Sequence, residues 1–381
     1  MTNFNLNIPT EIFFGKKSEE KIGQLLNRDN ITKVLLVYGT SSIKSTGLYK
    51  KIIQLLLDSS IEVEEYSGIK SNPILSDVNN AAQIGKKVGV EAILAVGGGS
   101  VMDSAKAIAS AIYNNCNAWD FYTGTEIKGA LPLYNIVTLA ATASEMNPSF
   151  VITNDKTKEK LGMGSPFCYP KVSILNPELT ITVPPNYTAY SAIDIFAHII
   201  EDYLTGVSVP NLVSRLKESL IRTVFETTEL ILQNPEDYNA RAEFMWTATM
   251  ALNGTTNRGT SGASFPNHMI VHGVSGVHDI PHGAGLSIII PAWMKFYKDK
   301  NRSQFSRFAK EIFNTDSIDS AIDELEKWFH SLGSPIRFSE YNIDETTFDE
   351  ITEKAFSHSK KWNLDNTYSR DVIKKILFIA K

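Results

Sequence analysis

Apolar and polar residues follow two different rhythms along the chain, and the rhythm changes near its middle. In the first half, short β-branched runs alternate with stretches whose apolar residues have helical spacing. The runs predict strands over 31–39, 61–68, 90–100 and 133–140, and the stretches predict helices over 46–60, 75–89 and 101–115. Ser76 is the expected N-cap of the second helix. This alternation is typical of a doubly wound parallel sheet, so we expect a Rossmann-like α/β domain.

The second half carries long helical patterns and almost no strand signal. Helices are predicted over 190–206, 211–233, 239–254, 317–333 and 369–381. The sequence VPPN at 183–186 interrupts the chain between the two rhythms. We therefore expect an α/β domain over 1–184 and an all-helical domain over 185–381. A cleft between two such domains is the default position for a ligand.

Composition and charge narrow the class of protein. The chain has 381 residues, 43% of them hydrophobic, and a net charge of −5 without a basic stripe, which argues against nucleic acid or an anionic membrane as a partner. The N-terminus lacks the features of a signal peptide, and no apolar run approaches the roughly 20 residues of a membrane span. The two cysteines, Cys116 and Cys168, fit a reducing compartment. We expect a cytoplasmic protein.

Three consecutive glycines stand between a predicted strand and a predicted helix. The segment EAILAVGGGSVMDSAKAIA places there Gly97, Gly98, Gly99 and Ser100. Bare backbone N–H groups at a helix N-terminus can hold a phosphate, but the GxGxxG fingerprint is absent because Met102 and Asp103 stand near the position of its third glycine. The glycines alone fit a phosphate site and a simple tight turn equally well. Asp103 either balances the helix dipole or holds a ligand hydroxyl or amide.

One predicted helix carries a carboxylate and an imidazole among apolar neighbours. Asp194 and His198 are four residues apart in SAIDIFAHIIEDYL, so they share one face of a helix that is apolar nearly all round. A buried carboxylate without a partner is very unfavourable. The compensating group is either the histidine itself, in an ion pair, or a divalent metal.

Four of the seven histidines fall within one glycine-containing stretch, NHMIVHGVSGVHDIPHGAG at 267–285. His268 and His272 have helical spacing, Gly273 and Gly276 are expected to break or loosen the helix, and His282 follows after a loop. A carboxylate with three imidazoles makes a four-ligand site for Zn²⁺ or Fe²⁺. Four protein ligands suggest a structural site unless a fifth position admits substrate. A single buried histidine is more often a core residue, but this cluster favours a metal.

These motifs together resemble the iron-containing (group III) alcohol dehydrogenases. The resemblance rests on GGGSVMDSAKAIA, LAATASEMNPSFVI, SAIDIFAHIIEDYL and the histidine stretch, in this order, and covers essentially the whole chain. The subgroup it most resembles contains the butanol dehydrogenases and broad-range aldehyde reductases that prefer NADPH. The resemblance implies a dehydroquinate synthase-like architecture, with a dinucleotide-binding N-terminal domain and a helical metal-binding C-terminal domain.

The resemblance also implies roles for individual residues. It makes the metal ligands Asp194, His198, His268 and His282. It places His272 near the substrate, where we expect it to relay a proton as the catalytic histidine. His278 is expected to line the pocket.

Coenzyme contacts carried over from the family follow the predicted strands. They fall on Gly39, Ser41, Ser42, Asn72, Gly97, Gly98, Gly99, Ser100, Asp103, Thr138, Thr142, Ser144, Lys160 and Leu179. Members that prefer NADH tend to have an aspartate where Thr40 stands here, and that carboxylate would repel a 2′-phosphate. Thr40, the neighbouring serines and Lys44 would accept it. We therefore expect NADP(H) as the preferred coenzyme, with NAD(H) possible, beside a divalent metal that is Fe²⁺ or Zn²⁺.

The sequence departs from the family pattern at three positions. Ala143 and Tyr190 stand where glycine is common, and Asn176 stands where aspartate is usual. None of these positions is a metal ligand. Ala143 puts the local coenzyme geometry in doubt, and Tyr190 puts the range of substrates in doubt.

The expected activity is metal-dependent hydride transfer between NAD(P)(H) and a small primary alcohol or aldehyde of the butanol and butanal type. A polyol or sugar-phosphate enzyme of the same fold stays open, as does a non-catalytic structural metal protein. A phosphate-binding relative would need basic residues near the metal, and the region offers chiefly Arg215, Lys217, Arg222, Arg241 and Arg258. The segment NFNLNIPTEIFFG could add a strand pair to a partner's sheet, so we expect a homodimer.

Overall fold

The computed structural model describes residues 1–381, which form two compact units. The α/β unit contains Asn7–Thr182 and Pro235–Thr249, and the helical unit contains Met1–Leu6, Val183–Asn234 and Met250–Lys381. The main division, between Thr182 and Val183, lies close to the expected boundary at 184/185. Two short segments join the unit opposite to the one expected: Met1–Leu6 belongs to the helical unit, and Pro235–Thr249 belongs to the α/β unit.

Long-range contacts explain both of these corrections. The N–H of Thr2 donates to the carbonyl of Gly259 (3.0 Å), which holds residues 1–6 in the helical unit. In the α/β unit, Arg241 donates to the carbonyl of Thr180 at 2.7 Å, which bonds the start of helix α8 (Tyr238–Leu252) to the preceding part of the chain. The helix as far as Thr249 belongs to that unit. Periodicity reports which face of a helix is apolar and carries no information about which unit covers that face.

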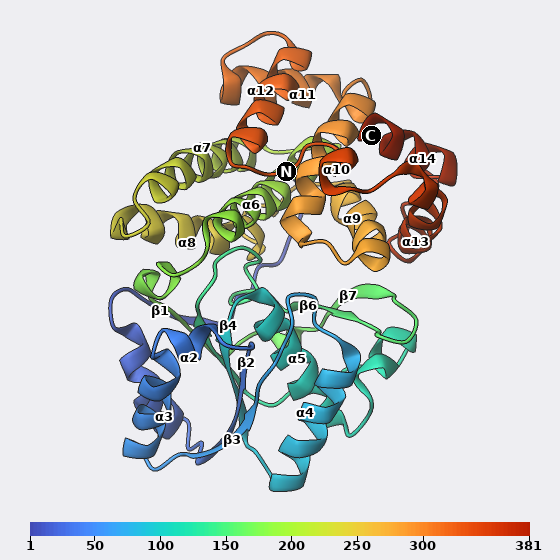
Figure 1. The fold of residues 1–381 in the computed structure, drawn as a ribbon. Coiled ribbons are helices and arrows are strands. Elements are labelled where there is room, and N and C mark those ends of the chain that lie inside the picture. The colour runs from blue at the N-terminus through green and yellow to red at the C-terminus, as the bar shows by residue number, and fades with distance from the viewer. The chain divides into compact units, whose positions relative to one another are not determined.

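A six-stranded sheet forms the centre of the α/β unit, in the order β1-β8-β5-β4-β2-β3 (Figure 1). Every neighbouring pair is parallel. The strands are β1 (Glu11–Phe14), β2 (Lys33–Tyr38), β3 (Glu62–Tyr66), β4 (Ala92–Gly97), β5 (Leu133–Val137) and β8 (Val172–Leu175). The central strands are buried on both faces, which is why they appear in the sequence as continuous apolar runs. A separate antiparallel hairpin joins β6 (Ser149–Thr153) and β7 (Lys160–Gly164).

Helices cover both faces of this sheet, as the doubly wound fold class predicts. One face packs on α1 (Ile22–Arg28) and α3 (Leu48–Asp58), and the other on α4 (Leu75–Val88) and α5 (Gly99–Asn114) (Figure 1). A short helix, α2 (Ser42–Ser45), follows β2. Ser76 is not the N-cap of α4. The N-cap is Ile74, and the N–H of Ser76 donates to Asp155 Oδ1 at 3.1 Å, so a carboxylate from the β6–β7 turn takes the capping role.

The second unit is built from helices, and prolines mark the start of the three that carry the predicted ligands. Pro185 is the first residue of α6 and Pro266 the first of α9, while Pro281 is the N-cap of α10. The helices of this unit are α6 (Pro185–Thr205), α7 (Asn211–Gln233), α9 (Pro266–His278), α10 (His282–Tyr297), α11 (Arg302–Phe313), α12 (Ile318–Ser331), α13 (Phe348–Lys361) and α14 (Arg370–Ile379). No helix is long and apolar enough to cross a membrane.

Single turns of 3₁₀-helix complete the fold at the ends of these elements. They are η1 (Ser18–Lys21), η2 (Ala118–Thr123), η3 (Pro166–Cys168), η4 (Pro177–Thr180), η5 (Phe338–Tyr341) and η6 (Glu345–Thr347).

The glycines inside α9 do not break the helix, contrary to the expectation from the sequence. Gly273 and Gly276 both lie within the continuous span Pro266–His278. A Cβ at Gly273 would stand 2.9 Å from the backbone nitrogen of Ala355 and 3.0 Å from the carbonyl oxygen of Ile351, both in α13. Glycine is therefore needed at this position for the close approach of two helices.

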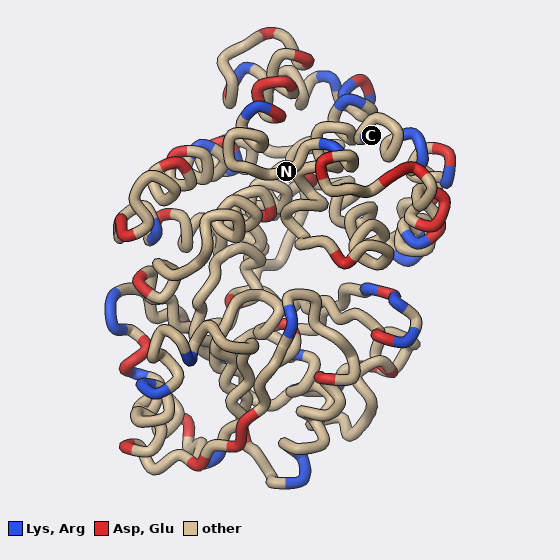
Figure 2. Tube along the Cα trace, viewed as in Figure 1, with Lys and Arg blue, Asp and Glu red and all other residues tan.

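Charged residues of both signs are interspersed over each unit (Figure 2). Many of them pair, as where the Lys51 ammonium lies 2.6 Å from Glu19 and 2.9 Å from Glu20. The view in Figure 2 shows no face of uniform positive charge, which agrees with the pattern of the sequence.

Candidate metal centre and coenzyme edge

The predicted ligand pair of α6 is buried on one face of the helix. Asp194 and His198 are 5% and 6% exposed, and the Nε2 of His198 lies 3.7 Å from Oδ1 of Asp194. The pair does not satisfy the carboxylate, because Oδ1 is buried and makes no hydrogen bond. Of the two interpretations left open by the sequence, a simple ion pair is therefore the weaker one.

Two further imidazoles from α9 and α10 point their Nε2 atoms at the same oxygen. The Nε2 of His268 is 3.4 Å and that of His282 is 3.7 Å from Oδ1 of Asp194. The rings of His198 and His268 stack at 4.7 Å with an interplanar angle of 18°. A Cβ at Gly283 would stand 2.3 Å from the carbonyl oxygen of Tyr190, so glycine lets α10 begin against the backbone of α6 and brings His282 to the cluster.

The spacing of these atoms fits a divalent cation. A tetrahedron whose ligands lie about 2.1 Å from its centre has edges of about 3.4 Å, and the three separations between Oδ1 of Asp194 and the histidine Nε2 atoms are 3.4–3.7 Å. The ligand atoms of Asp194, His268 and His282 all lie within 4.8 Å of one another. The buried Nε2 of His268 also makes no hydrogen bond. A cation would therefore give a partner to two buried atoms that make no hydrogen bond, Oδ1 of Asp194 and Nε2 of His268.

Electrostatics in the cluster favour positive charge. Burial alone would raise the pKa of Asp194, but the histidines around it, led by His198, hold that pKa well below its usual range. Burial would lower the pKa of His268, yet the carboxylates of Glu201 and Asp194 raise it to about 10. A site that stabilises a proton so strongly is also suited to a metal cation when the proton is absent.

The structure adds a residue that our reading of the sequence missed. Glu201 is completely buried on α6, and its Oε2 is hydrogen-bonded to Nδ1 of His268. A signal was present, because Asp194, His198 and Glu201 follow the i, i+4, i+7 spacing of a single helix face.

The predicted catalytic histidine lies beside the ligands, one turn further along α9. His272 is 4% exposed, and its ring centre is 5.7 Å from that of His282. The rings of His358 and Trp362 meet it edge-on at 5.7 and 5.6 Å, and the sequence pattern had not indicated either of them. The Nε2 of His278 is hydrogen-bonded to Thr347 Oγ1 at 2.9 Å, so that ring is engaged by η6.

The predicted coenzyme residues gather at one edge of the parallel sheet in the α/β unit. Most of them follow the carboxyl ends of strands: Gly39, Ser41 and Ser42 after β2, Asn72 after β3, Gly97 at the end of β4 with Gly98, Gly99 and Ser100 directly after it, Thr138 after β5 and Leu179 after β8. This edge is where open parallel sheets bind ligands. Lys160, at the start of β7, donates to Asn72 Oδ1 at 2.8 Å and is thereby tied to the same edge.

The segment 138–144 packs closely against the glycine turn and by itself requires glycine at two positions. A Cβ at Gly98 would meet Leu139 at 3.1 Å, and a Cβ at Gly99 would meet Thr142 at 2.6 Å. The two alternatives left open by the sequence are therefore compatible, since the glycines permit a tight packing that also leaves the N-terminus of α5 at the ligand edge.

Asp103 is hydrogen-bonded to the end of the segment 138–144 and to strand β6. Its two carboxylate oxygens accept hydrogen bonds from Ser144 Oγ (2.7 Å) and from the N–H of Val151 (3.0 Å). Lys106, which our sequence analysis did not select, is fully buried and donates to Ser144 Oγ at 2.7 Å and to the carbonyl of Asn147 at 2.8 Å. Asp103 and Ser144 are thus bonded to each other, and Asp103 fixes the segment 138–144, which contains three of the predicted coenzyme residues.

Each half of the chain matches a known protein family. The family described as iron-containing alcohol dehydrogenase matches residues 9–177, and the C-terminal domain of Fe-containing alcohol dehydrogenases matches residues 188–380. This chain belongs to the iron-containing alcohol dehydrogenase family. The predicted fold class and the expectation of a metal-dependent oxidoreductase are confirmed.

Several relatives within the family are similar over nearly their whole length. A protein named probable NADH-dependent butanol dehydrogenase 1 from Bacillus subtilis is 39% identical over 98% of both chains. An NADPH-dependent aldehyde reductase from Escherichia coli is 33% identical over 94% of both chains. The crystal structure of NADH-dependent butanol dehydrogenase A from Thermotoga maritima has a TM-score of 0.96 and 41% identity, covering 100% of this chain and 99% of that one.

The alternative of a sugar-phosphate enzyme is not favoured. Its phosphate pocket would require basic residues near the metal, and two of the candidates are engaged elsewhere. Lys217 is buried in an ion pair with Asp202, and Arg241 donates to backbone carbonyls in the α/β unit.

The departures from the family pattern have local explanations. Ala143 adopts a left-handed conformation (φ 52°) that glycine reaches without strain, so the backbone keeps the glycine-type geometry at about 1–2 kcal/mol of strain. Asn176 accepts from the N–H of Glu178 and donates to Glu19 Oε2 at 2.8 Å, which an aspartate would repel. Tyr190 packs edge-on against Tyr187 at 6.0 Å.

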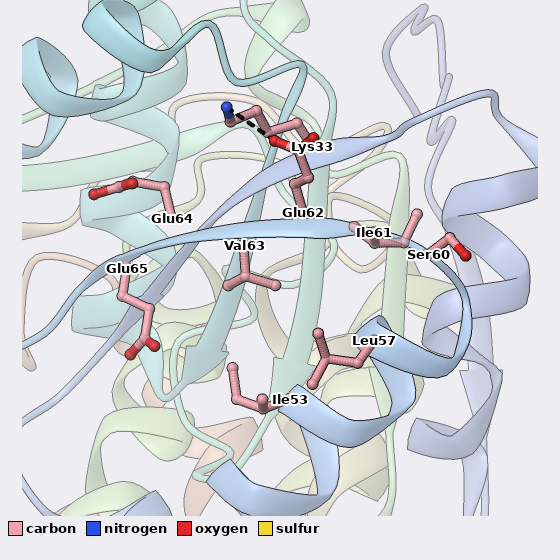
Figure 3. A pocket seen from close by; sticks show the side chains of 9 residues that line it. All are labelled: Lys33, Ile53, Leu57, Ser60, Ile61, Glu62, Val63, Glu64 and Glu65. Atoms are coloured by element: carbon pink, nitrogen blue, oxygen red, sulfur yellow. Dashed lines mark ion pairs between the residues drawn. The ribbon is translucent and has the colours of Figure 1, made fainter.

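The pocket in Figure 3 lies elsewhere, between α3 and β3. It is lined by nine residues, and none of them is a predicted metal or coenzyme residue. Its glutamates Glu62, Glu64 and Glu65 would repel the phosphates of a dinucleotide. We assign it no part in the reaction.

Proposed function

We propose that this protein interconverts small primary alcohols and aldehydes, of the butanol and butanal type, using a nicotinamide coenzyme and a divalent metal. The metal would be held by Asp194, His198, His268 and His282. The convergence of three imidazole Nε2 atoms on one buried, unbonded carboxylate oxygen carries the proposal. The names of full-length relatives, butanol dehydrogenases and an aldehyde reductase, support the class of substrate.

The residues of the chain supply binding, orientation and proton transfer. A bound Zn²⁺ or Fe²⁺ supplies a Lewis acid, which polarises an aldehyde carbonyl or acidifies an alcohol. The hydride chemistry belongs to the nicotinamide, and the edge of the α/β unit orients that coenzyme. Asp194 and the three predicted ligand histidines would hold the cation in a buried setting where charge interactions are strong. His272 is our candidate for moving the proton at the substrate oxygen.

An assay with metal-depleted protein tests this function. The protein is stripped of metal, restored with Fe²⁺, with Zn²⁺ or with nothing, and mixed with butanal and either NADPH or NADH. We expect a loss of nucleotide absorbance that depends on the added metal. Inactivity in every mixture with coenzyme still bound would indicate a polyol or sugar substrate. Inactivity without coenzyme binding would indicate a structural metal.

The order of the strands indicates which residues would contact the 2′ position of the coenzyme's adenosine ribose. In a Rossmann sheet the glycine motif follows strand 1, and strand 2 lies beside strand 1. Here the glycine turn follows β4, and β2 lies beside β4, so β2 corresponds to strand 2. The end of that neighbouring strand holds the adenosine ribose, through an acid in NAD enzymes and beside an arginine in NADP enzymes. Thr40 stands there without a carboxylate, and Lys44 follows four residues later.

The rings of two tyrosines hold Lys44 at this position. The ammonium of Lys44 lies 5.2 Å from the ring centre of Tyr38 and 5.1 Å from that of Tyr49. Both tyrosine hydroxyls donate to Glu65, at 2.8 and 2.9 Å, which fixes the two rings beside Lys44. These contacts support our proposal that NADP(H) is preferred, with NAD(H) accepted. Relatives of both coenzyme types occur among the similar proteins, so direct measurement has to decide the preference.

Replacement of Lys44 tests the preference. We expect Lys44→Ala to lower kcat/KM for NADPH about tenfold, equal to about 1.4 kcal/mol for one lost charge contact, and to leave kcat/KM for NADH unchanged. Lys50→Ala, which removes an exposed lysine from α3, is the matched control. Equal losses with both coenzymes, or a wild-type preference for NADH, would contradict the proposal.

We also propose a homodimer that works in the cytoplasm. β1 is an edge strand, and the preceding segment leaves Phe4 and Leu6 52% and 41% exposed, as expected of an arm that packs on a second copy. Cys116 and Cys168 are both free thiols, in keeping with a reducing compartment. Light scattering of the full chain and of a variant lacking residues 1–6 tests the dimer, which the deletion should weaken.

A further inference from the structure

The carboxylate of Glu201 contacts three hydrogen-bond donors at the start of helix α9. It is completely buried on α6. Its Oε1 accepts the backbone N–H groups of Asn267 and His268, the latter at 3.2 Å, and its Oε2 pairs with Nδ1 of His268. A buried carboxylate is retained only where such bonds offset its loss of hydration.

We propose that Glu201 is a positioning residue for the metal centre, which sets both the tautomer of His268 and the start of helix α9. This inference rests on the proposed metal at Asp194. An ionised carboxylate can only accept hydrogen bonds, so the Nδ1 that it contacts must carry a proton. In the neutral ring Nε2 is then the unprotonated nitrogen, and this is the atom that faces Oδ1 of Asp194 at 3.4 Å.

The same carboxylate replaces the missing cap of α9. The N-cap residue Phe265 offers no side-chain hydrogen bond, and Pro266 at the first position has no N–H group. The next two N–H groups, of Asn267 and His268, both donate to Glu201. The positive end of the helix dipole adds to the attraction. One side chain therefore holds the helix start and the ring of His268 to α6, which also carries Asp194 and His198.

The neighbours of Glu201 on α6 have other tasks, which makes a selective test possible. Asp202 pairs with Lys217, and the hydroxyl of Tyr203 donates to Glu218 at 2.8 Å. Thr205 also joins α6 to the segment before α9, because its Oγ1 accepts the N–H of Ser264 at 2.9 Å. Thr205 touches no histidine of the cluster in these bonds. It is therefore a matched control for a general loosening of the two helices.

The first experiment compares the Zn²⁺ affinity of metal-depleted wild type, Glu201→Gln and Thr205→Val by competition with a chromophoric chelator. A glutamine can turn its NH₂ group toward Nδ1 and so place the proton of His268 on Nε2, the wrong nitrogen for a metal. We expect Glu201→Gln to bind Zn²⁺ about 10–100-fold more weakly, and Thr205→Val to bind like wild type. Unchanged affinity in Glu201→Gln, or an equal loss in Thr205→Val, would overturn the inference.

A second measurement uses the wild-type chain and does not depend on the folding of any variant. In Zn²⁺-loaded protein, nitrogen-15 NMR of the histidine rings should show His268 protonated at Nδ1, and a resonance without that proton would overturn the inference. Failure of the proposed function is distinguishable, because it would appear as inactivity of metal-loaded wild type with butanal, whereas the role of Glu201 is measured by Zn²⁺ affinity and by the histidine resonance. Wild-type Zn²⁺ binding that is matched by Glu201→Gln removes only the role of Glu201.

Discussion

The candidate metal centre and the candidate coenzyme edge are built in opposite ways. The metal centre consists of charged and imidazole side chains buried inside helices, with Asp194, His198 and His268 each less than 10% exposed. The coenzyme edge consists of glycines, serines and threonines at the ends of strands, several of them partly exposed. The first binds through the chemistry of particular side chains and the second through the shape of the backbone. Substitutions should therefore damage one without the other.

Removal of the central carboxylate should have the largest effect. Asp194→Ala deletes the oxygen on which three imidazoles converge, so we expect the metal to be lost. Loss of several kcal/mol of charge stabilisation corresponds to about a 1,000-fold fall in activity or more. Metal analysis and butanal reduction measure both effects. Coenzyme binding should survive, because that edge belongs to the α/β unit, and loss of coenzyme binding would argue against two separable sites.

His272→Ala should affect turnover and spare the metal. The ring lies beside the ligands at 5.7 Å from His282, and loss of an acid–base group lowers rates by about 100-fold or more. Metal content should remain at the wild-type level while kcat falls. A variant that loses its metal would show that His272 is a ligand and that one of the other histidines has been assigned wrongly.

A pair of glycine substitutions should separate the two regions. A Cβ at Gly283 would stand 2.3 Å from the backbone of Tyr190, and a Cβ at Gly99 would stand 2.6 Å from Thr142. Each added methyl group should cost about 1–3 kcal/mol of stability. We expect Gly283→Ala to weaken metal binding by displacing His282, and Gly99→Ala to raise the KM for the coenzyme with the metal retained. If both variants lost the same property, the comparison would fail.

The smallest effect concerns pH and a histidine outside the cluster. Burial lowers the pKa of His278, although Glu350 and Asp344 oppose this. The unfolded chain therefore binds more protons just below the ordinary pKa of about 6.5, so this residue makes the fold less stable as the pH falls through that value. His278→Gln removes the effect. Urea unfolding at about pH 7.5 and about pH 5.5 should show a shallower loss of stability in the variant than in wild type.

Local patterns predicted much of the fold, and long-range contacts account for what they missed. The alternation of strands and helices predicted β2 to β5, and helical spacing predicted α6, α7 and α8 within a few residues. The short strand β8 went unnoticed, because four residues carry too little periodicity. The residues of β1 were expected in a strand pair on a partner's sheet, and in the structure they form the edge strand beside β8 of the same chain. Gly273 was interpreted as a helix breaker because the neighbouring backbone of α13 is invisible in the sequence.

The sequence by itself determined the family and the two kinds of architecture, since motifs and local periodicity carry that information directly. It also predicted the set of metal ligands. Only the tertiary structure decided that Glu201 holds His268, that Lys106 supports the coenzyme segment, and that residues 1–6 and 235–249 join units distant in sequence. The physical reason is the range of the interactions. Periodicity and capping act over one or two turns. The contact of Lys106 with Ser144 joins residues 38 positions apart, and that of Glu201 with His268 joins residues 67 positions apart.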